Sequence, residues 1–463
     1  ARDCVGRLVA QSSSMIAEDG ASAVQLEMPR PVAVAHELEC FVYDGDTPLA
    51  VERRVFTMPV PYPYEDFTYL MWSYPGGDLP VRVENRLCYE MGTDMMDLCH
   101  MRGYTDAGAA REYALASMSG QRLVPYVTRI AGEERPDNTL VPSLFSEEWI
   151  EHERQSMQVA SRQAAPYQPP AYTLGDENYM SHGRYEVEVS PASMKAFREW
   201  LRDKYENIDA LNAVWDTDHA DFDAITKPML LDEALQQPES CAPWFDFRAF
   251  MDSAFAGLHQ HMAGFVRAED PGAKVGWDGF LGYHWGAGYD FYKLTRDLEL
   301  NQCYTSGYLQ GELIRSLKEP GALTGEWGNA VADREDGFTA IGWHNLFRGH
   351  NSCWWWTSWG CDYIPFNPDM TVSDAGRWYF NAAREIKSGP GRLLLHATRE
   401  DSSVLVLYNQ ADLYAQVLAT RLRGGSVWDG GHEFENNLSA ISRALQDAGY
   451  PYRFLAAAEL ETN

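Results

Sequence analysis

Short apolar runs alternate with longer amphipathic stretches from about residue 66 onward, and this alternation predicts strands and helices in turn. Eight runs have the length and composition of buried strands: Phe67–Ser73, Met95–His100, Leu123–Arg129, Ala171–Gly175, Lys274–Trp277, Leu298–Tyr304, Ala322–Gly325 and Cys353–Thr357. The helical pattern is clearest at Ala107–Ser119, Ser146–Ala164, Pro191–Lys204, Phe245–Ala268 and Thr339–Phe347. The order predicts a parallel α/β fold, and eight strands favour a closed (β/α)₈ TIM barrel over an open doubly wound sheet.

The segments on either side of the predicted barrel have a different pattern. Strand-like runs in the first sixty residues, separated by turn signals, predict part of a small β-sandwich: Val24–Met28, Glu37–Tyr43 and Ala50–Met58. Near the other end, apolar runs at Val404–Tyr408 and Tyr452–Ala456 enclose a helical stretch at Asn436–Ala448. This β–α–β order predicts a small doubly wound domain, which we expect to be incomplete. The domains we predict are thus residues 1–60, 61–391 and 392–463.

Composition narrows the functional classes. Hydrophobic residues make up 45% of the 463 positions and charged residues 23%, as in an ordinary folded protein. The net charge of −29 repels phosphate backbones, so we expect no nucleic-acid partner. We find no apolar stretch of about 20 residues, and therefore expect a soluble protein, cytoplasmic or secreted, without a membrane partner. The eight scattered cysteines contain no CxxC pair, and the glycine-rich segments lack a phosphate-loop pattern. We expect neither a metal nor a cofactor.

Two glutamates follow predicted barrel strands in settings that suggest catalysis. Glu177 closes the fourth strand, in Gly175-Asp176-Glu177-Asn178, and Glu326 closes the seventh, in Gly325-Glu326-Trp327. Catalytic groups of TIM barrels lie at the carboxyl ends of strands, and glycosidic cleavage needs two facing carboxyl groups. An average glutamate is a solvated surface acid, which is the competing interpretation for each residue taken alone.

The segment after Glu177 resembles family 42 glycoside hydrolases, which are β-galactosidases of the (β/α)₈ clan A. The similar residues are Phe197-Arg198-Glu199-Trp200-Leu201, Lys204-Tyr205, Leu211-Asn212, Trp215 and Thr217, then Trp244–Arg248, Phe250 and Asp270-Pro271. The resemblance extends from about Ala171 to Asp369. More loosely, Val404–Gln410 is similar to the start of that family's flavodoxin-like trimerisation domain.

This resemblance implies an activity and a set of roles. It implies a retaining, exo-acting β-galactosidase with a β-galactoside substrate, in which Glu177 is the acid/base and Glu326 the nucleophile of a covalent glycosyl-enzyme. It also implies a homo-oligomer, with a trimer as the expected form. One departure is Asp176, which stands where the clan has an asparagine that binds the sugar 2-hydroxyl. An aspartate beside Glu177 accepts a hydrogen bond but, when ionised, cannot donate one. The N-terminal segment is a second departure from the family.

Further residues are candidates for sugar binding. Tyr304 ends the sixth strand and resembles the clan's tyrosine that hydrogen-bonds the nucleophile, although a core tyrosine is as common. Strand alternation places Trp354 and Trp356 on one face and Trp355 on the other, and Trp356 or Trp359 is expected to stack on the sugar. Arg102 and Arg129 follow the second and third strands, where either could hold a sugar hydroxyl or form a salt bridge.

Two other functions fit part of the pattern. One is an agarase-like hydrolase of a galactose-containing polysaccharide, because several clan A enzymes join an N-terminal sandwich to a barrel. The other is a catalytically silent sugar-binding barrel, which would bind sugar without turnover. The presence of both Glu177 and Glu326 argues against the silent barrel.

Overall fold

The structure is a computed structural model of the chain. It describes residues 1–460 apart from 5, 19, 30, 32, 74–77, 98–112, 184, 281–284, 305–307, 329–333, 357–363 and 401–403. Arg102 and Trp359, two of the predicted sugar-binding residues, lie outside the described residues.

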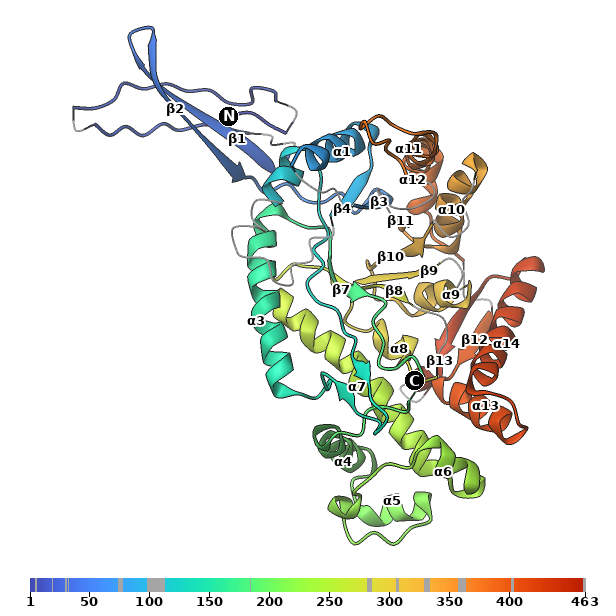
Figure 1. Cartoon of the computed structure of the whole chain (residues 1–463). Helices are drawn as coiled ribbons and strands as arrows, with labels where there is room; N and C mark the ends of the chain where they lie inside the picture. The colour runs from blue at the N-terminus through green and yellow to red at the C-terminus, as the bar shows by residue number, and fades with distance from the viewer. Residues whose placement is uncertain are drawn as a thin grey trace.

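A seven-stranded parallel sheet forms the centre of the molecule (Figure 1). Its strands run in the order β4 (Asp94–Asp97), β3 (Thr68–Ser73), β11 (Ser352–Trp356), β10 (Leu323–Trp327), β9 (Leu300–Tyr304), β8 (Val275–Phe280) and β7 (Tyr172–Asp176). This is the neighbour order that the TIM barrel prediction requires, and the mixed α/β fold with a curled parallel sheet is confirmed.

The run predicted as the third barrel strand, Leu123–Arg129, is not a regular strand. It makes one parallel bridge, between Tyr126 and Thr173, beside β7. The Thr173 amide donates a hydrogen bond of 2.9 Å to the Pro125 carbonyl, and the Thr173 carbonyl accepts one of 3.0 Å from the Val127 amide. Pro125 itself has no N–H to donate, which shortens the ladder. The segment nevertheless occupies the expected place next to β7.

Helices alternate with these strands or follow them. They are α1 (Asp78–Met91), α3 (Glu147–Ala164), α4 (Pro191–Tyr205), α5 (Ile208–Trp215), α6 (Leu231–Gln236), α7 (Ala242–Arg267), α8 (Phe291–Leu294), α9 (Tyr308–Leu317), α10 (Glu335–Arg348), α11 (Asp374–Ile386) and α12 (Gly389–Leu395). The predicted starts of α3 and α4 are confirmed. Ser146 accepts a hydrogen bond from the Trp149 amide, and Ser190 accepts one from the Ser193 amide. The helix predicted at Ala107–Ser119 is described only in its last part, where residues 113–118 are helical.

The strands bury both of their faces. One face forms an interior cluster, made by Leu70, Trp72, Val124, Tyr126, Ala171, Leu300, Leu323, Trp327 and Trp354. The opposite face packs against the helices and includes Tyr172, Leu174, Val275, Trp277 and Cys303. On β10 this alternation turns Leu323 and Trp327 to the interior. Thr324 and Glu326 therefore point to the opposite face, so Glu326 faces the helices.

The N-terminal segment forms a β-hairpin that extends away from the sheet (Figure 1). Its strands, β1 (Ala35–Asp44) and β2 (Thr47–Thr57), pair antiparallel. The expected strand at Val24–Met28 is wrong: those residues have no strand partner, and Val24 is 49% exposed. A lone apolar run does not form a strand without a neighbour to bond and cover it. The β-sandwich stays a prediction.

The C-terminal segment contains β12 (Val404–Tyr408), α13 (Gln410–Leu422), α14 (Val427–Asp447), β13 (Tyr452–Ala456) and α15 (Ala457–Leu460). The two strands pair in parallel, as the β–α–β pattern predicts. The second helix begins earlier than Asn436, because Ser426 and Asp429 form a capping box at its start. The flavodoxin-like, trimer-forming character of this segment stays a prediction.

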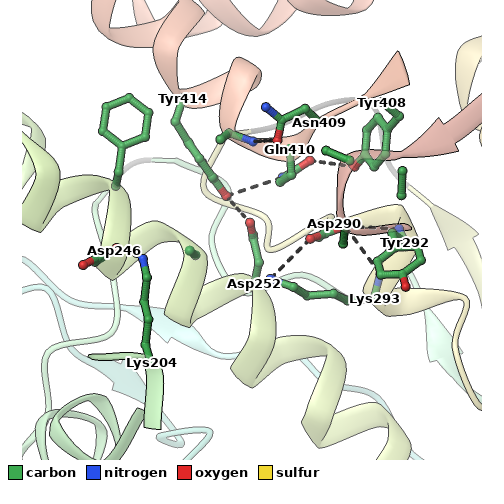
Figure 2. A pocket seen from close by; sticks show the side chains of 16 residues that line it. Lys204, Asp246, Asp252, Asp290, Tyr292, Lys293, Tyr408, Asn409, Gln410 and Tyr414 are labelled. Atoms are coloured by element: carbon green, nitrogen blue, oxygen red, sulfur yellow. Dashed lines mark hydrogen bonds and ion pairs between the residues drawn. The ribbon is translucent and has the colours of Figure 1, made fainter. Parts of the chain in front are cut away.

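A cavity of about 340 Å³ lies between the C-terminal segment and the helices α7 and α8 (Figure 2). Its polar side chains pair with one another. The Tyr414 hydroxyl donates to Asp252 at 2.6 Å, Lys293 lies 3.3 Å from Asp290, and Lys204 pairs with Asp246. The Tyr414–Asp252 hydrogen bond joins the C-terminal segment to α7, whereas the other two pairs lie among the barrel helices.

Candidate active site

The turn after β7 determines where Glu177 lies. Gly175 has φ +125°, and a Cβ there would come within 2.5 Å of the Asn178 side-chain oxygen and 2.8 Å of the Thr128 carbonyl. Asn178 is buried and fixes the turn, because it accepts from the Ile130 amide and donates to the Leu174 carbonyl, each at 3.0 Å. Glu177 itself has φ +52°, a left-handed conformation that is uncommon for a glutamate. Strained residues of this kind gather at functional sites.

Three residues predicted from the sequence surround the Glu177 carboxyl group. The Tyr304 hydroxyl donates to Glu177 Oε1 at 2.8 Å and lies 3.1 Å from Asp176 Oδ1. A guanidinium nitrogen of Arg129 lies 3.6 Å from Glu177 Oε2. The Glu177 side chain is 39% exposed, so one side of its carboxyl group is open to an incoming ligand. Tyr304 was expected beside the nucleophile, and the structure places it beside the predicted acid/base instead.

A third carboxyl group lies next to this pair, and the sequence alone did not identify it as part of the site. Asp278 on β8 is the register partner of Asp176 on β7, and it is fully buried. Its Oδ1 accepts from the Thr173 hydroxyl at 2.9 Å. Burial, and then the neighbouring Glu177 charge, raise the pKa of Asp176 to about 7. Burial and the Asp176 charge raise the pKa of Asp278 well above its ordinary value.

Glu326 lies in a different environment. It is 1% exposed and pairs with Arg348 of α10, whose guanidinium also lies 3.5 Å from Glu312 of α9. Helix α9 crosses so closely that a Cβ on Gly311 would overlap the Glu326 carboxyl oxygen. Burial raises the pKa of Glu326 to about 7, in spite of the opposing effect of Arg348. In this conformation the carboxyl group lies between β10 and the helices, on the opposite face from Trp327.

The nucleophile role of Glu326 therefore stays a prediction, and it requires the side chain to change its position. A nucleophile must approach within about 3–3.5 Å of the anomeric carbon. The carboxyl group meets this condition only if the end of β10 turns it away from Arg348 and toward the barrel interior.

The aromatic residues of β11 divide between the two faces as the alternation predicts. Trp354 belongs to the interior cluster, Trp356 packs against it, and Trp355 belongs to the cluster between the sheet and α11. Trp356 is half-buried, and its ring centroid lies 5.1 Å from that of Trp72. It shares the interior face with Tyr304, which packs against the same cluster. Stacking of Trp356 on a sugar stays a prediction.

The described residues include no group of three or more His, Cys, Asp or Glu side chains placed to hold a metal ion. Within the same residues, no helix has both the length and the apolar character needed to cross a membrane.

Comparison with known proteins gives one sequence match and several structural ones. Residues 160–319 match the family model described as Glyco_hydro_42, beta-galactosidase. The matched segment contains Glu177, Asp278 and Tyr304 and ends before Glu326. A search of curated proteins finds no match.

The similar solved structures include three β-galactosidases, each 14% identical to this chain. The enzyme from the psychrophile Marinomonas ef1 has a TM-score of 0.63, with 84% of this chain and 70% of that chain covered. The enzyme from Rahnella sp. R3 has a TM-score of 0.63, with 85% and 65% covered. The enzyme from the haloarchaeon Halorubrum lacusprofundi has a TM-score of 0.61, with 78% and 64% covered.

At this identity the structural likeness concerns the fold, and the chain spans about two thirds of the length of these structures. The sequence match is what carries the family resemblance. The predicted similarity to family 42 is confirmed over residues 160–319, and the findings together indicate a glycoside hydrolase.

Proposed function

We propose that the chain is a retaining β-galactosidase that acts without a cofactor, with Glu177 as its general acid/base. The observation that carries this proposal is the position of the Glu177 carboxyl group. It lies at the carboxyl end of a barrel strand and is partly open, with Tyr304 and Arg129 on its other sides. Polar groups at this end of a parallel barrel form the catalytic site of TIM-barrel enzymes.

The acid/base role has a direct chemical basis in this geometry. In the first step Glu177 gives its proton to the glycosidic oxygen as the bond to the leaving group breaks. In the second step the resulting carboxylate removes a proton from the water that hydrolyses the intermediate. The Tyr304 hydroxyl, 2.8 Å from Oε1, holds the carboxyl group in one orientation through both steps.

We also propose Glu326 as the nucleophile, with the condition stated above. Its attack on the anomeric carbon forms the glycosyl-enzyme while Glu177 protonates the leaving oxygen. The support is its position at the end of β10, the strand on which the family resemblance implies the nucleophile. In a retaining enzyme the two carboxyl groups approach about 5–5.5 Å from each other, so a structure with a trapped intermediate must show Glu326 turned to the barrel interior.

Chemical rescue tests the two roles together. Glu177→Ala still forms the intermediate from an aryl galactoside, and added azide accelerates its turnover and gives a galactosyl azide of retained configuration. Glu326→Ala cannot form the intermediate, and any azide product has inverted configuration. If Asp278→Ala gives the inverted azide and Glu326→Ala keeps substantial activity, the nucleophile is Asp278 and our assignment of Glu326 is wrong.

The substrate class and the assembly are tested separately. A panel of aryl glycosides, galactosyl disaccharides, and agarose and other galactan oligosaccharides separates a β-galactosidase from an agarase-like galactan hydrolase. Tight galactoside binding without turnover of any substrate would identify the silent sugar-binding barrel. Light scattering at micromolar concentration tests the homo-oligomer, for which the resemblance suggests a trimer.

A further inference from the structure

The carboxyl groups of Asp176 and Asp278 lie side by side at the ends of two paired strands. The register between β7 and β8 shifts after Thr173, and beyond this irregularity Asp176 and Asp278 are partners, so their side chains leave neighbouring strands at the same level. Adjacent strands are about 4.8 Å apart, which brings two such carboxyl groups into close range. Gly279, at φ +69°, allows this approach, because a Cβ there would overlap Asp176 Oδ1.

The surroundings of the pair contain little positive charge. Asp176 faces Glu177 in the same turn, Tyr304 from β9 and Arg129 from the segment after residue 120. Its backbone amide donates to the Tyr126 hydroxyl at 3.0 Å. Arg129 lowers the pKa of Asp176, but less than burial and Glu177 raise it. Asp278 faces Thr173, Asp176 and Glu177. Within the described part of the chain, no cation lies within ion-pair distance of Asp278.

The two carboxyl oxygens of Asp278 have different surroundings. Thr173 donates to Oδ1, whereas Oδ2 is buried and has no hydrogen-bond partner among the described residues. A buried ionised carboxylate with one bare oxygen and another carboxylate beside it is strongly disfavoured. Two acids in this arrangement avoid the cost by holding one proton between them.

We propose that Asp176 and Asp278 share one proton and act as a single monoanionic unit beside Glu177. The proposal rests on Glu177 being the general acid/base, and it makes Asp278 a positioning residue that never touches the sugar. The shared proton lets Asp176 donate a hydrogen bond as an amide would, while the pair keeps a single negative charge beside Glu177.

Asparagine substitutions of the two aspartates show whether the pair carries one negative charge or two. In Asp278→Asn the shared proton is no longer needed and Asp176 alone carries the charge, so the alkaline limb of kcat/KM against pH should stay near the wild-type position. In Asp176→Asn the fully buried Asp278 becomes a neutral acid, so the negative charge disappears. The alkaline limb should then move to lower pH by roughly one unit. The double variant should match Asp176→Asn.

Infrared spectroscopy measures the shared proton without relying on activity. At pH 7 the difference spectrum of wild type minus Asp278→Asn should contain the carbonyl band of one protonated carboxyl group. Circular dichroism and thermal melting of each variant check that the fold is intact, and Glu177→Gln tests the proposed function independently. Loss of activity in Glu177→Gln together with no protonated band would overturn the shared proton and leave the hydrolase proposal standing.

Two kinetic outcomes also overturn the inference. If Asp278→Asn shifts the alkaline limb as far as Asp176→Asn does, both groups were ionised and no proton was shared. If neither variant shifts it, the pair does not act on Glu177. If no substrate is turned over by any form of the protein, the infrared measurement alone decides whether the proton is shared.

Discussion

Glu177 and Glu326 stand at equivalent places in the sequence pattern, each at the end of a barrel strand, yet the structure gives them opposite surroundings. Glu177 lies in a left-handed turn beyond the strand, 39% exposed, with a tyrosine and an arginine beside it. Glu326 is still within β10, 1% exposed, and paired with Arg348 under two helices. The difference shows that being at a strand end does not by itself place a side chain in the barrel mouth. The residue must also lie on the interior face or beyond the last paired position.

The largest expected effect tests the Glu177 side of this comparison. Glu177→Gln keeps the shape and hydrogen bonding of the side chain but cannot transfer a proton. Because general acid–base catalysis contributes about 10²–10⁴-fold, kcat/KM on a galactosyl disaccharide should fall by about 10³-fold. The loss should be smaller for an aryl galactoside, whose leaving group needs little protonation. Glu239→Gln, at an exposed position, is the matched control and should behave as the wild type. Unchanged activity in Glu177→Gln would remove the site.

The next effect tests whether Glu326 is catalytic, structural or both. Glu326→Ala leaves Arg348 beside the Glu312 carboxylate and opens space under α9. Breaking a buried pair of this kind costs about 3–5 kcal/mol, which urea denaturation should detect. The variant Glu326→Ala/Arg348→Met should recover part of that stability. If the double variant also recovers activity, Glu326 is a structural residue and not the nucleophile.

The pH dependence of stability sharpens the same point. Burial raises the folded-state pKa of Glu326 to about 7, above the ordinary value of 4.5. A group with a raised folded pKa contributes stability below its unfolded pKa and loses that contribution as the pH rises through the folded pKa. The wild type should therefore lose on the order of 2–3 kcal/mol relative to Glu326→Gln between about pH 4.5 and pH 7.5. Parallel stability curves for the two proteins would show that Arg348 keeps Glu326 ionised throughout.

Two glycines allow a smaller, matched comparison of the two environments. Gly175→Ala puts a Cβ at φ +125° and against Asn178, and Gly311→Ala puts one against the Glu326 carboxyl group. Each should cost about 1–3 kcal/mol of stability. Gly175→Ala should also lower kcat, because it disturbs the turn that holds Glu177. If Gly311→Ala lowers kcat as much at equal stability, the environment of Glu326 matters to the chemistry.

The last prediction concerns Tyr304, for which we expect the smallest change in stability. Tyr304→Phe removes the hydrogen bond to Glu177 and the contact with Asp176 but retains the ring. A hydrogen bond to a charged group contributes about 1.5–3 kcal/mol, so kcat should fall by roughly ten- to a hundredfold with little change in melting temperature. An unchanged kcat would make Tyr304 a packing residue of the interior cluster.

The sequence predicts the parallel sheet and the turn around Glu177 because both depend on local signals. The β7 turn contains Gly175, Asp176 and Asn178, whose backbone and hydrogen-bonding preferences act over a few residues. The side of the sheet to which Glu326 points cannot be predicted from such local signals. Both faces of a parallel barrel strand are buried, so Leu-Thr-Gly-Glu-Trp does not show which face is interior. Glu326 is paired with Cys303 on β9 and Cys353 on β11. These partners show which face Glu326 occupies, but only when the pairing of the strands is known.

Asp278 was harder to identify for a related reason. The sequence shows an acid after an apolar run, which is common on protein surfaces. Its importance comes from the register that aligns it with Asp176 and from the Thr173 hydroxyl that bonds to it across the sheet. The C-terminal pairing of β12 with β13 was predictable, since both strands are short apolar runs separated by a helical segment.

The N-terminal hairpin has a consequence for handling the protein. Its second strand has exposed apolar side chains, including Leu49, Val51 and Val55, which are 64%, 53% and 43% exposed. The hairpin is the whole of its sheet among the described residues. Arg2 pairs with Glu37 on the outer edge of β1, so the outer edge of β2 is the one that offers backbone N–H and C=O groups to a strand of another molecule. In a concentrated preparation this is where edge-to-edge association would begin, and replacing Val51 and Val55 with lysine is the economical way to keep the molecules apart.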